Sequence, residues 1–339
     1  MSASYRWIHR VWYEDAASGW VLLPLSAVYW LLLKLRALFF RIGVFRTYKA
    51  HAPVIVVGNI TAGGTGKTPT VIWLVNELRT RGFKPGIVSR GYGGSKSGAS
   101  MRVDVDSDAS VVGDEPVLLA RRGQCPVVVD TDRVRAASML VEDGVNVIIA
   151  DDGLQHLRLQ RDYEICVVDG ERVLGNRRLL PAGPLRESPN RLDNVDQVLV
   201  NGSTDRANAV AFELRANDAC RLNGSLARPL RRFKDTTVHG VAGIGNPKRF
   251  FDLLRSYGIQ VIEHDFPDHA AIEQSDLRFG DEFDVFMTEK DAVKLGSNLS
   301  DKYWYVPVDL FMEPEKADTL IEQIALKLRS CGEEPCGDE

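Results

Sequence analysis

The chain has 339 residues, of which 45% are hydrophobic and 26% are charged, and its formal net charge at pH 7 is −4. This composition excludes a disordered chain, and the length allows two domains of ~150 residues, each with a sizeable core. Charge is unevenly distributed, because seven basic residues stand against Glu14 and Asp15 in residues 1–51 and give that segment a net charge of +5.

Residues 1–45 are predicted to form a helical segment that associates with a membrane. No charged residue occurs from Trp20 to Leu33, and the apolar character continues to Phe45. This uncharged stretch is shorter than the ~20 residues of a spanning helix, so we expect the segment to lie in the interface, helped by its tryptophans and cations. Lys34 and Arg41 would share one helix face, with Arg36 nearly opposite. The alternative is a helix packed in the core.

The stretch from Val54 to Pro69 predicts a site for nucleotide phosphates. An apolar run that is typical of a buried strand leads into a glycine-rich loop, and a helix is expected over 70–81. Lys67 would reach the β- and γ-phosphates, and the Thr68 hydroxyl would reach Mg²⁺. The phosphate-binding residues would be Thr61, Ala62, Gly63, Gly64, Thr65, Gly66, Lys67 and Thr68. Thr61 occupies a position that is glycine in the strict pattern, and a plain glycine-rich turn is the alternative.

The middle of the chain alternates predicted strands with helical stretches. Strands are expected at 86–89, 126–129, 145–150 and 165–168, which favours a parallel sheet covered by helices on both faces. Asp151 and Asp152 follow one of these strands directly, at the edge where this kind of fold holds its Mg²⁺-binding aspartate. Either of them could instead cap the following turn. We therefore predict an α/β fold of the P-loop NTPase type, with this domain over 46–208.

A second, smaller α/β domain is predicted over 236–330, after a strand-rich connector at 209–235. Strands are expected from Val238, at 284–287 and at 303–308, and a last helix at 316–328. Gly243-Ile244-Gly245 lacks the third glycine of a dinucleotide-binding fingerprint, so no second nucleotide site is expected.

Five cysteines are scattered along the chain. Cys125, Cys166 and Cys220 lie in or beside apolar runs, as buried thiols do, which indicates a reducing cytosol. Cys331 and Cys336 lie in the tail, 331–339, for which a frayed terminus is favoured over half of a zinc site.

Several motifs together resemble the tetraacyldisaccharide 4'-kinase family over nearly the whole chain. They are Gly58-Asn59, Gly63 to Pro69, Ser89-Arg90-Gly91-Tyr92-Gly93, Gly113-Asp114-Glu115-Pro116, Asp151 to His156, Leu180 to Glu187, Ala242 to Pro247 and Thr288-Glu289-Lys290-Asp291. The resemblance implies a kinase that uses ATP and Mg²⁺ to phosphorylate the 4' hydroxyl of a lipid A precursor, a tetraacyl disaccharide 1-phosphate. It also implies the cytoplasmic face of the bacterial inner membrane as the location.

The resemblance also implies roles for particular side chains. Asp114 would accept the proton of the sugar hydroxyl with His269 as its partner, next to the catalytic Lys67. Glu115 is a further candidate ligand of Mg²⁺ besides Thr68, Asp151 and Asp152. The residues expected around the sugar and its phosphate are Tyr92, Arg133, Gln155, His156, Arg186 and Glu187. Plainer interpretations stay open: a helix N-cap for Asp114, a surface-loop position for His269, a first-turn glutamate for Glu115, and structural ion pairs for the arginines.

Two other classes of protein remain as alternatives. One is a P-loop NTPase that couples hydrolysis to a partner protein, as metallochaperones and maturation GTPases do, and the other is a membrane-bound nucleotide-binding scaffold without turnover. Nucleic acid is not expected as a ligand, because cations within an apolar, tryptophan-rich segment fit anionic lipid better than a duplex. No obligate protein partner is inferred.

Overall fold

The larger of two β-sheets carries the glycine-rich loop. The computed structural model describes residues 3–14, 16–95, 98–268, 270–295 and 300–332. In this sheet the strand order is β15-β8-β7-β6-β1-β5-β2-β4-β3, and all neighbours are parallel except β3 and β15 at the two edges. The strands are β1 (Val54–Gly58), β2 (Pro85–Ser89), β3 (Met101–Val103), β4 (Val127–Val129), β5 (Val147–Asp151), β6 (Tyr163–Asp169), β7 (Gln197–Asn201), β8 (Ala209–Arg215) and β15 (Asp309–Phe311).

Helices cover both faces of this sheet, as the unbroken apolar strands predict. Alternate residues of β1 pack in different cores, one on each face of the sheet. Ile55 and Val57 belong to the first core, and Val54 and Val56 belong to the second. Helices α3 (Lys67–Thr80), α5 (Asp114–Gly123) and α9 (Pro314–Gly332) contribute to the first core, and α6 (Arg133–Glu142) contributes to the second. The short α4 (Ala109–Val112) precedes α5. The predicted fold class is confirmed.

The smaller sheet has the order β10-β9-β14-β13-β11-β12. Its strands are β9 (Asp218–Arg221), β10 (Ala227–Pro229), β11 (Thr237–Ala242), β12 (Gln260–Asp265), β13 (Asp284–Thr288) and β14 (Tyr303–Val306), with helices α7 (Pro247–Ser256) and α8 (Glu289–Ala292). The strand predicted over 303–308 ends at Val306, and the chain then returns to the larger sheet as β15 and α9. The predicted unit 236–330 therefore does not stay with the smaller sheet to its end, because α9 packs on α3.

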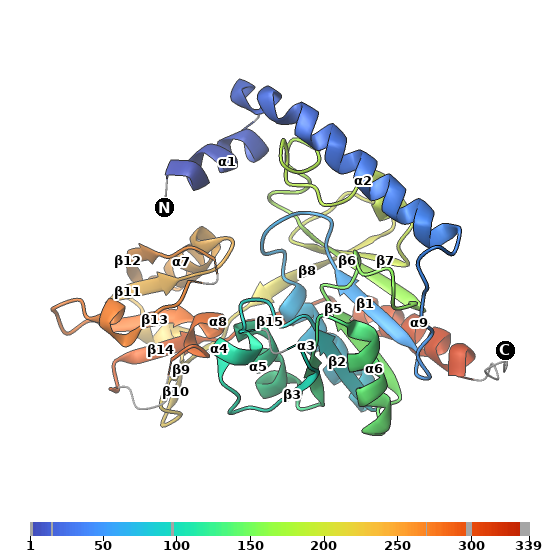
Figure 1. Cartoon of the computed structure of the whole chain (residues 1–339). Coiled ribbons are helices and arrows are strands. Elements are labelled where there is room, and N and C mark those ends of the chain that lie inside the picture. The colour runs from blue at the N-terminus through green and yellow to red at the C-terminus, as the bar shows by residue number, and fades with distance from the viewer. Residues whose placement is uncertain (1–2, 15, 96–97, 269, 296–299, 333–339) are drawn as a thin grey trace.

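The N-terminal segment lies on the outside of the molecule. It consists of α1 (Ala3–Tyr13), a short 3₁₀ turn (Ala17–Leu22) and the long α2 (Leu23–Arg41), which Figure 1 shows running across the top of the view. One face of α2 is docked through polar contacts: Ser26 donates to the carbonyl of Leu179, Tyr29 to that of Arg186, and Arg36 to that of Gln155. The rest of its surface carries exposed apolar side chains, among them Val28, Leu32, Leu35 and Phe39, so the helix is not part of a core.

The two sheets meet over the glycine-rich loop. Gly245, after β11, approaches this loop so closely that an added Cβ would lie 2.7 Å from the backbone nitrogen of Gly64. A second contact joins α5 to α8, where Arg122 forms an ion pair with Glu289 at 2.6 Å. These contacts place residues of the smaller sheet at the carboxyl edge of the larger one, where parallel α/β folds bind ligands.

Candidate active site

The glycine-rich loop between β1 and α3 is built to hold an anion. Helix α3 begins at Lys67, earlier than the predicted 70, because Gly66 takes a left-handed conformation (φ 102°) that turns the chain directly into the helix. The Asn201 side chain donates to the carbonyl of Thr65 at 3.3 Å and braces the loop. The Thr65 hydroxyl is buried without a hydrogen-bond partner. Backbone amides and the helix N-terminus therefore face a site that suits phosphate.

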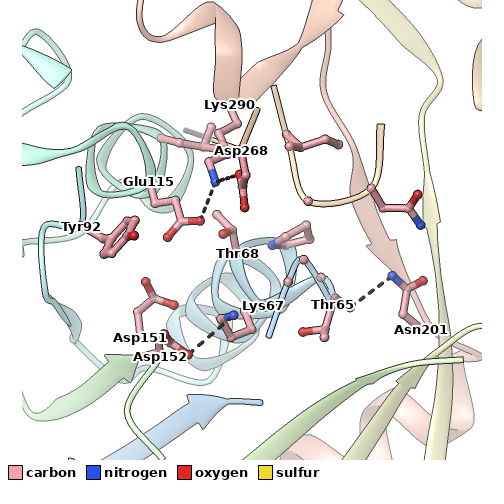
Figure 2. Close-up of a pocket in the computed structure, with 18 of the residues that line it drawn as sticks. Thr65, Lys67, Thr68, Tyr92, Glu115, Asp151, Asp152, Asn201, Asp268 and Lys290 are labelled. Carbon is pink, nitrogen blue, oxygen red and sulfur yellow. Dashed lines mark hydrogen bonds and ion pairs between the residues drawn. The ribbon is translucent and has the colours of Figure 1, made fainter. Parts of the chain in front are cut away.

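A cavity of about 1150 Å³ opens over this loop and runs between the two sheets. Its floor is formed by Gly63 to Pro69, and its smaller-sheet wall includes Ile244, Gly245, Phe250 and Lys290. Figure 2 shows Lys67 and Thr68 at the centre, with Asp151 and Asp152 on one side and Lys290 and Asp268 on the other. The cavity therefore gathers side chains from segments that are far apart in the sequence.

Asp151 and Asp152 follow β5 at the edge of the cavity but have different environments. The backbone at Asp152 has φ 48°, so the two side chains diverge. Nζ of Lys67 lies 3.6 Å from Asp152 Oδ1, and Arg186 donates to the same carboxylate at 3.0 Å. Burial works to raise the pKa of Asp152, but the charges of Lys67 and Arg186 outweigh it and the pKa is lowered.

Asp151 is buried and accepts a hydrogen bond from Ser89 at 3.3 Å. Burial, followed by the negative charges of Glu115 and Asp152, raises the pKa of Asp151 to about 7. A cation placed among these carboxylates would remove the repulsion between them. Asp152 already has its cations in Lys67 and Arg186, so Asp151 and Glu115 are the carboxylates that would gain most from one.

A cationic wall lies beyond Asp152. Arg133 begins α6, is 4% exposed, and donates from Nη2 to the carbonyl of Asp152, while its Nη1 has no hydrogen-bond partner. Nε2 of His156 is also buried and without a partner. Burial and the charges of Arg133, Arg161 and Arg36 lower the pKa of His156 to about 4, so its ring is neutral at pH 7. Two unsatisfied nitrogens in one wall suit an oxygen-rich ligand.

Asp114 and Glu115 start α5, and they differ in their access to the cavity. Glu115 lines the cavity, whereas Asp114 is 5% exposed and is not among the lining residues. The N-cap alternative for Asp114 is wrong, because Gly113 occupies that position. Oδ2 of Asp114 instead lies 3.6 Å from Nζ of Lys294, after α8. His269 lies outside the described residues, so its pairing with Asp114 stays a prediction.

Lys290 is a cavity residue for which the sequence suggested no role, although it lies in a motif of the resemblance. Its Nζ is 3.0 Å from Oε1 of Glu115 and 3.4 Å from Oδ1 of Asp268 (Figure 2). Burial alone would lower the pKa of Lys290, but the charges of Glu115 and Asp268 raise it, so the side chain is an ammonium ion. Its motif and its position just after a strand of a parallel sheet were the signals in the sequence that pointed to it.

The other predicted site residues divide into those that reach the cavity and those that do not. Tyr92, Gln155 and Arg186 line it together with Arg133, His156, Asp151 and Asp152. Glu187 does not; it accepts a hydrogen bond from Gln155 at 2.6 Å and thereby orients that amide. Thr61 and Ala62 do not line it either, because Thr61 pairs with Leu185 and the Ala62 amide donates to Pro184, which anchors the start of the loop.

The residues present fit Mg²⁺ only together with a nucleotide. Among the described residues, no group of three or more His, Cys, Asp or Glu side chains is arranged to hold a metal ion. Mg²⁺ is normally held by one or two carboxylates, water and substrate phosphates rather than by a cage of protein ligands. Thr68, Glu115 and Asp151 lie around the phosphate cradle as this mode requires.

Known proteins match nearly the whole chain. A family model described as tetraacyldisaccharide-1-P 4'-kinase matches residues 18–326. A tetraacyldisaccharide 4'-kinase of Nitrosococcus oceani is 47% identical over 94% of this chain and 96% of its own length. One of Methylobacillus flagellatus is 45% identical, with the same coverage of 94% and 96%.

The fold has a solved counterpart. A crystal structure described as an "apo" form of LpxK from Aquifex aeolicus in complex with ATP is similar to this chain with a TM-score of 0.76 and 28% sequence identity. The similarity covers 91% of this chain and 99% of that one.

Proposed function

The chain belongs to the tetraacyldisaccharide 4'-kinase family, and from this premise we propose how its residues transfer the γ-phosphoryl group of ATP to the 4' hydroxyl of a tetraacyl glucosamine disaccharide 1-phosphate. It is an ATP-dependent lipid kinase of lipid A biosynthesis. The observation that carries the assignment of roles is the single cavity that joins the phosphate-binding loop, the carboxylates after β5 and the cationic wall.

The glycine-rich loop binds the nucleotide phosphates. Its amides and the N-terminus of α3 donate to the phosphate oxygens, and Lys67 leaves Asp152 for the β- and γ-phosphates. Arg186 remains on Asp152 and keeps that carboxylate charged and oriented. Phosphoryl transfer depends on such positioning and charge neutralisation more than on covalent chemistry.

Thr68, Glu115 and Asp151 are the residues that would hold Mg²⁺, and Asp152 keeps Arg186 as its cationic partner instead. The ion would supply charge neutralisation of the transferring phosphoryl group. This division follows from the contacts in the cavity, because Asp152 has two cationic partners within 3.6 Å, whereas Asp151 lies between two other carboxylates in a buried position.

The sugar side of the cavity is assigned to the wall beyond Asp152. Arg133 and His156 offer unsatisfied nitrogens, and the Gln155 amide is held in place by Glu187. Asp114 and His269 act as a unit that takes up the proton of the 4' hydroxyl. Asp114 is buried beside Lys294 and away from bulk water, which suits a residue that works through a partner.

The exposed face of α2 rests in the membrane interface at the cytoplasmic face of the inner membrane. By length and composition, residues 17–41 could cross a bilayer, and only 6% of their most apolar window is buried. However, the docked face is bonded to the protein from Ser26 to Arg36, and a helix held along its length cannot cross without losing these bonds. Leu25, Leu32 and Phe39 would enter the lipid, close to a substrate whose acyl chains stay in the bilayer.

One assay tests the proposed function directly. The purified protein is incubated with γ-labelled ATP and the lipid A disaccharide 1-phosphate in detergent micelles, and a labelled bisphosphorylated lipid is expected. Release of labelled inorganic phosphate at the same rate with and without lipid would instead favour an NTPase that serves a protein partner. Nucleotide binding without turnover would favour a scaffold.

A further inference from the structure

The turn after β13 aims three consecutive charged residues in different directions. Thr288 caps α8, and Asp291 is completely buried, where it accepts from the Gly243 amide at 2.8 Å and from Lys294 at 2.8 Å. Glu289 pairs with Arg122 on α5. With its neighbours fixed on either side, Lys290 is directed into the cavity toward Thr68, as Figure 2 shows.

The partners of Lys290 come from both sides of the cavity. Glu115 belongs to α5 of the larger unit and Asp268 to the loop after β12, yet both carboxylates contact the same ammonium group. Glu115 is also one of the carboxylates that we assign to the metal. A divalent cation on Glu115 would stand within a few ångströms of the Lys290 ammonium, where two like charges in a partly buried site repel strongly. A divalent cation on Glu115 therefore weakens the contact between Glu115 and Lys290.

We propose that Lys290 is a second cationic phosphate-binding residue, supplied by the smaller sheet, which holds Glu115 in the empty site and transfers to the terminal phosphate when the metal–nucleotide complex arrives. This inference rests on the proposed function, because it takes Glu115 as a metal ligand. Glu115 is then paired in both states, with Lys290 in the empty site and with the metal ion when the nucleotide is bound. It also gives the smaller sheet a contact with ATP that ADP, which lacks the γ-phosphate, does not offer.

The exchange predicts opposite effects of one substitution on two equilibria. Lys290→Met removes the charge but keeps the length and apolar stem of the side chain. We expect the preference for the Mg²⁺ complex of a non-hydrolysable ATP analogue over that of ADP to fall about tenfold. The affinity of the ADP complex for Mn²⁺ should rise about tenfold, because Glu115 no longer has a competing cation.

The test uses isothermal titration calorimetry for nucleotides and electron paramagnetic resonance for free Mn²⁺ on the full-length protein in detergent. Lys290→Arg should keep the preference for the ATP analogue. Lys248→Met, on the exposed face of α7, is the matched control and should change neither equilibrium. Glu115→Gln alters the other partner of the contact between Lys290 and Glu115 and should weaken Mn²⁺ binding. This variant can be measured even if Lys290→Met folds poorly.

Two results would overturn the inference. Equal losses of ADP and ATP-analogue affinity in Lys290→Met would mean that the residue only maintains the structure. Unchanged or weaker Mn²⁺ binding in that variant would mean that it does not compete for Glu115. Failure of the proposed function is separate: it would appear as absent lipid phosphorylation by the unaltered protein, whatever Lys290 does.

Discussion

Nζ of Lys67 lies 3.6 Å from Oδ1 of Asp152, so the lysine of the phosphate-binding loop rests on the carboxylate that follows β5. The lysine is thereby held in place at the cavity before any phosphate binds, and its charge is balanced. When a nucleotide binds, its phosphates replace the Asp152 carboxylate as the anionic partner of Lys67. The mostly buried ammonium group of Lys67 therefore stays paired.

Lys67→Ala and Thr68→Ala should each lower kcat for lipid phosphorylation by at least a hundredfold with the fold intact. Lys67 stabilises charge that develops on the transferring group, where one lost donor costs about 3 kcal/mol. Lys84→Ala and Thr80→Ala, both exposed, are the matched controls and should retain full activity. Turnover close to normal in folded Lys67→Ala and Thr68→Ala would remove the assignment of this loop.

Asp114→Ala combined with His269→Ala should cost little more activity than Asp114→Ala alone. Groups that act as a unit are not additive, since removal of either one already disables the pair. The kcat values of the two single variants and the double variant decide whether Asp114 and His269 act as a unit. A double variant that shows the product of the two single losses would mean that the residues work independently, and full activity of Asp114→Ala would mean that its carboxylate has a structural role only.

The pH dependence of stability should carry the signature of His156. Its pKa is lowered to about 4 in the folded chain from the ordinary 6.5, so the unfolded chain binds a proton between these values that the folded chain does not. The free energy of unfolding should therefore fall as the pH drops from 6.5 to 4, and this loss should be smaller in His156→Gln.

Urea unfolding at several pH values measures this difference. His51→Gln, an exposed histidine that does not line the cavity, is the comparison variant. If the pH profiles of His156→Gln and the unaltered protein run parallel, the ring of His156 is not held neutral by its surroundings.

The membrane contact should depend on the outer face of α2. Leu25→Gln with Leu32→Gln should strongly reduce sedimentation with anionic vesicles and raise the KM for micellar or vesicle-bound lipid far more than the KM for ATP, because these exposed side chains would lose their burial in lipid. Lys34→Gln with Arg41→Gln should instead blunt the salt dependence of binding.

Arg36 is left out of that charge variant because its guanidinium donates to Gln155 at the cavity. Leu326→Gln, an exposed leucine on α9, is the matched control and should bind vesicles normally. Full sedimentation of the Leu25→Gln, Leu32→Gln variant, with an unchanged KM for lipid, would mean that α2 does not contact the membrane.

The sequence by itself determined the features that depend on neighbours along the chain. The apolar run before Gly63 and Gly64, followed by Lys67 and Thr68, predicts a strand, a phosphate-binding loop and a helix in order, because each is encoded within about ten residues. Asp151 and Asp152 could be placed at the cavity because parallel strands all end at one edge of a sheet.

Only the tertiary structure decided which charges meet. Lys290 pairs with Glu115 across 175 positions of sequence, and the return of β15 and α9 to the larger sheet was not visible in any local pattern. Likewise, periodicity does not distinguish Asp152, paired with Lys67 and Arg186, from Asp151, which is buried among carboxylates. Local sequence fixes backbone conformation and side-chain alternation, whereas the partner of a charge depends on how separate elements pack, and that packing is set by the burial of apolar faces throughout the chain.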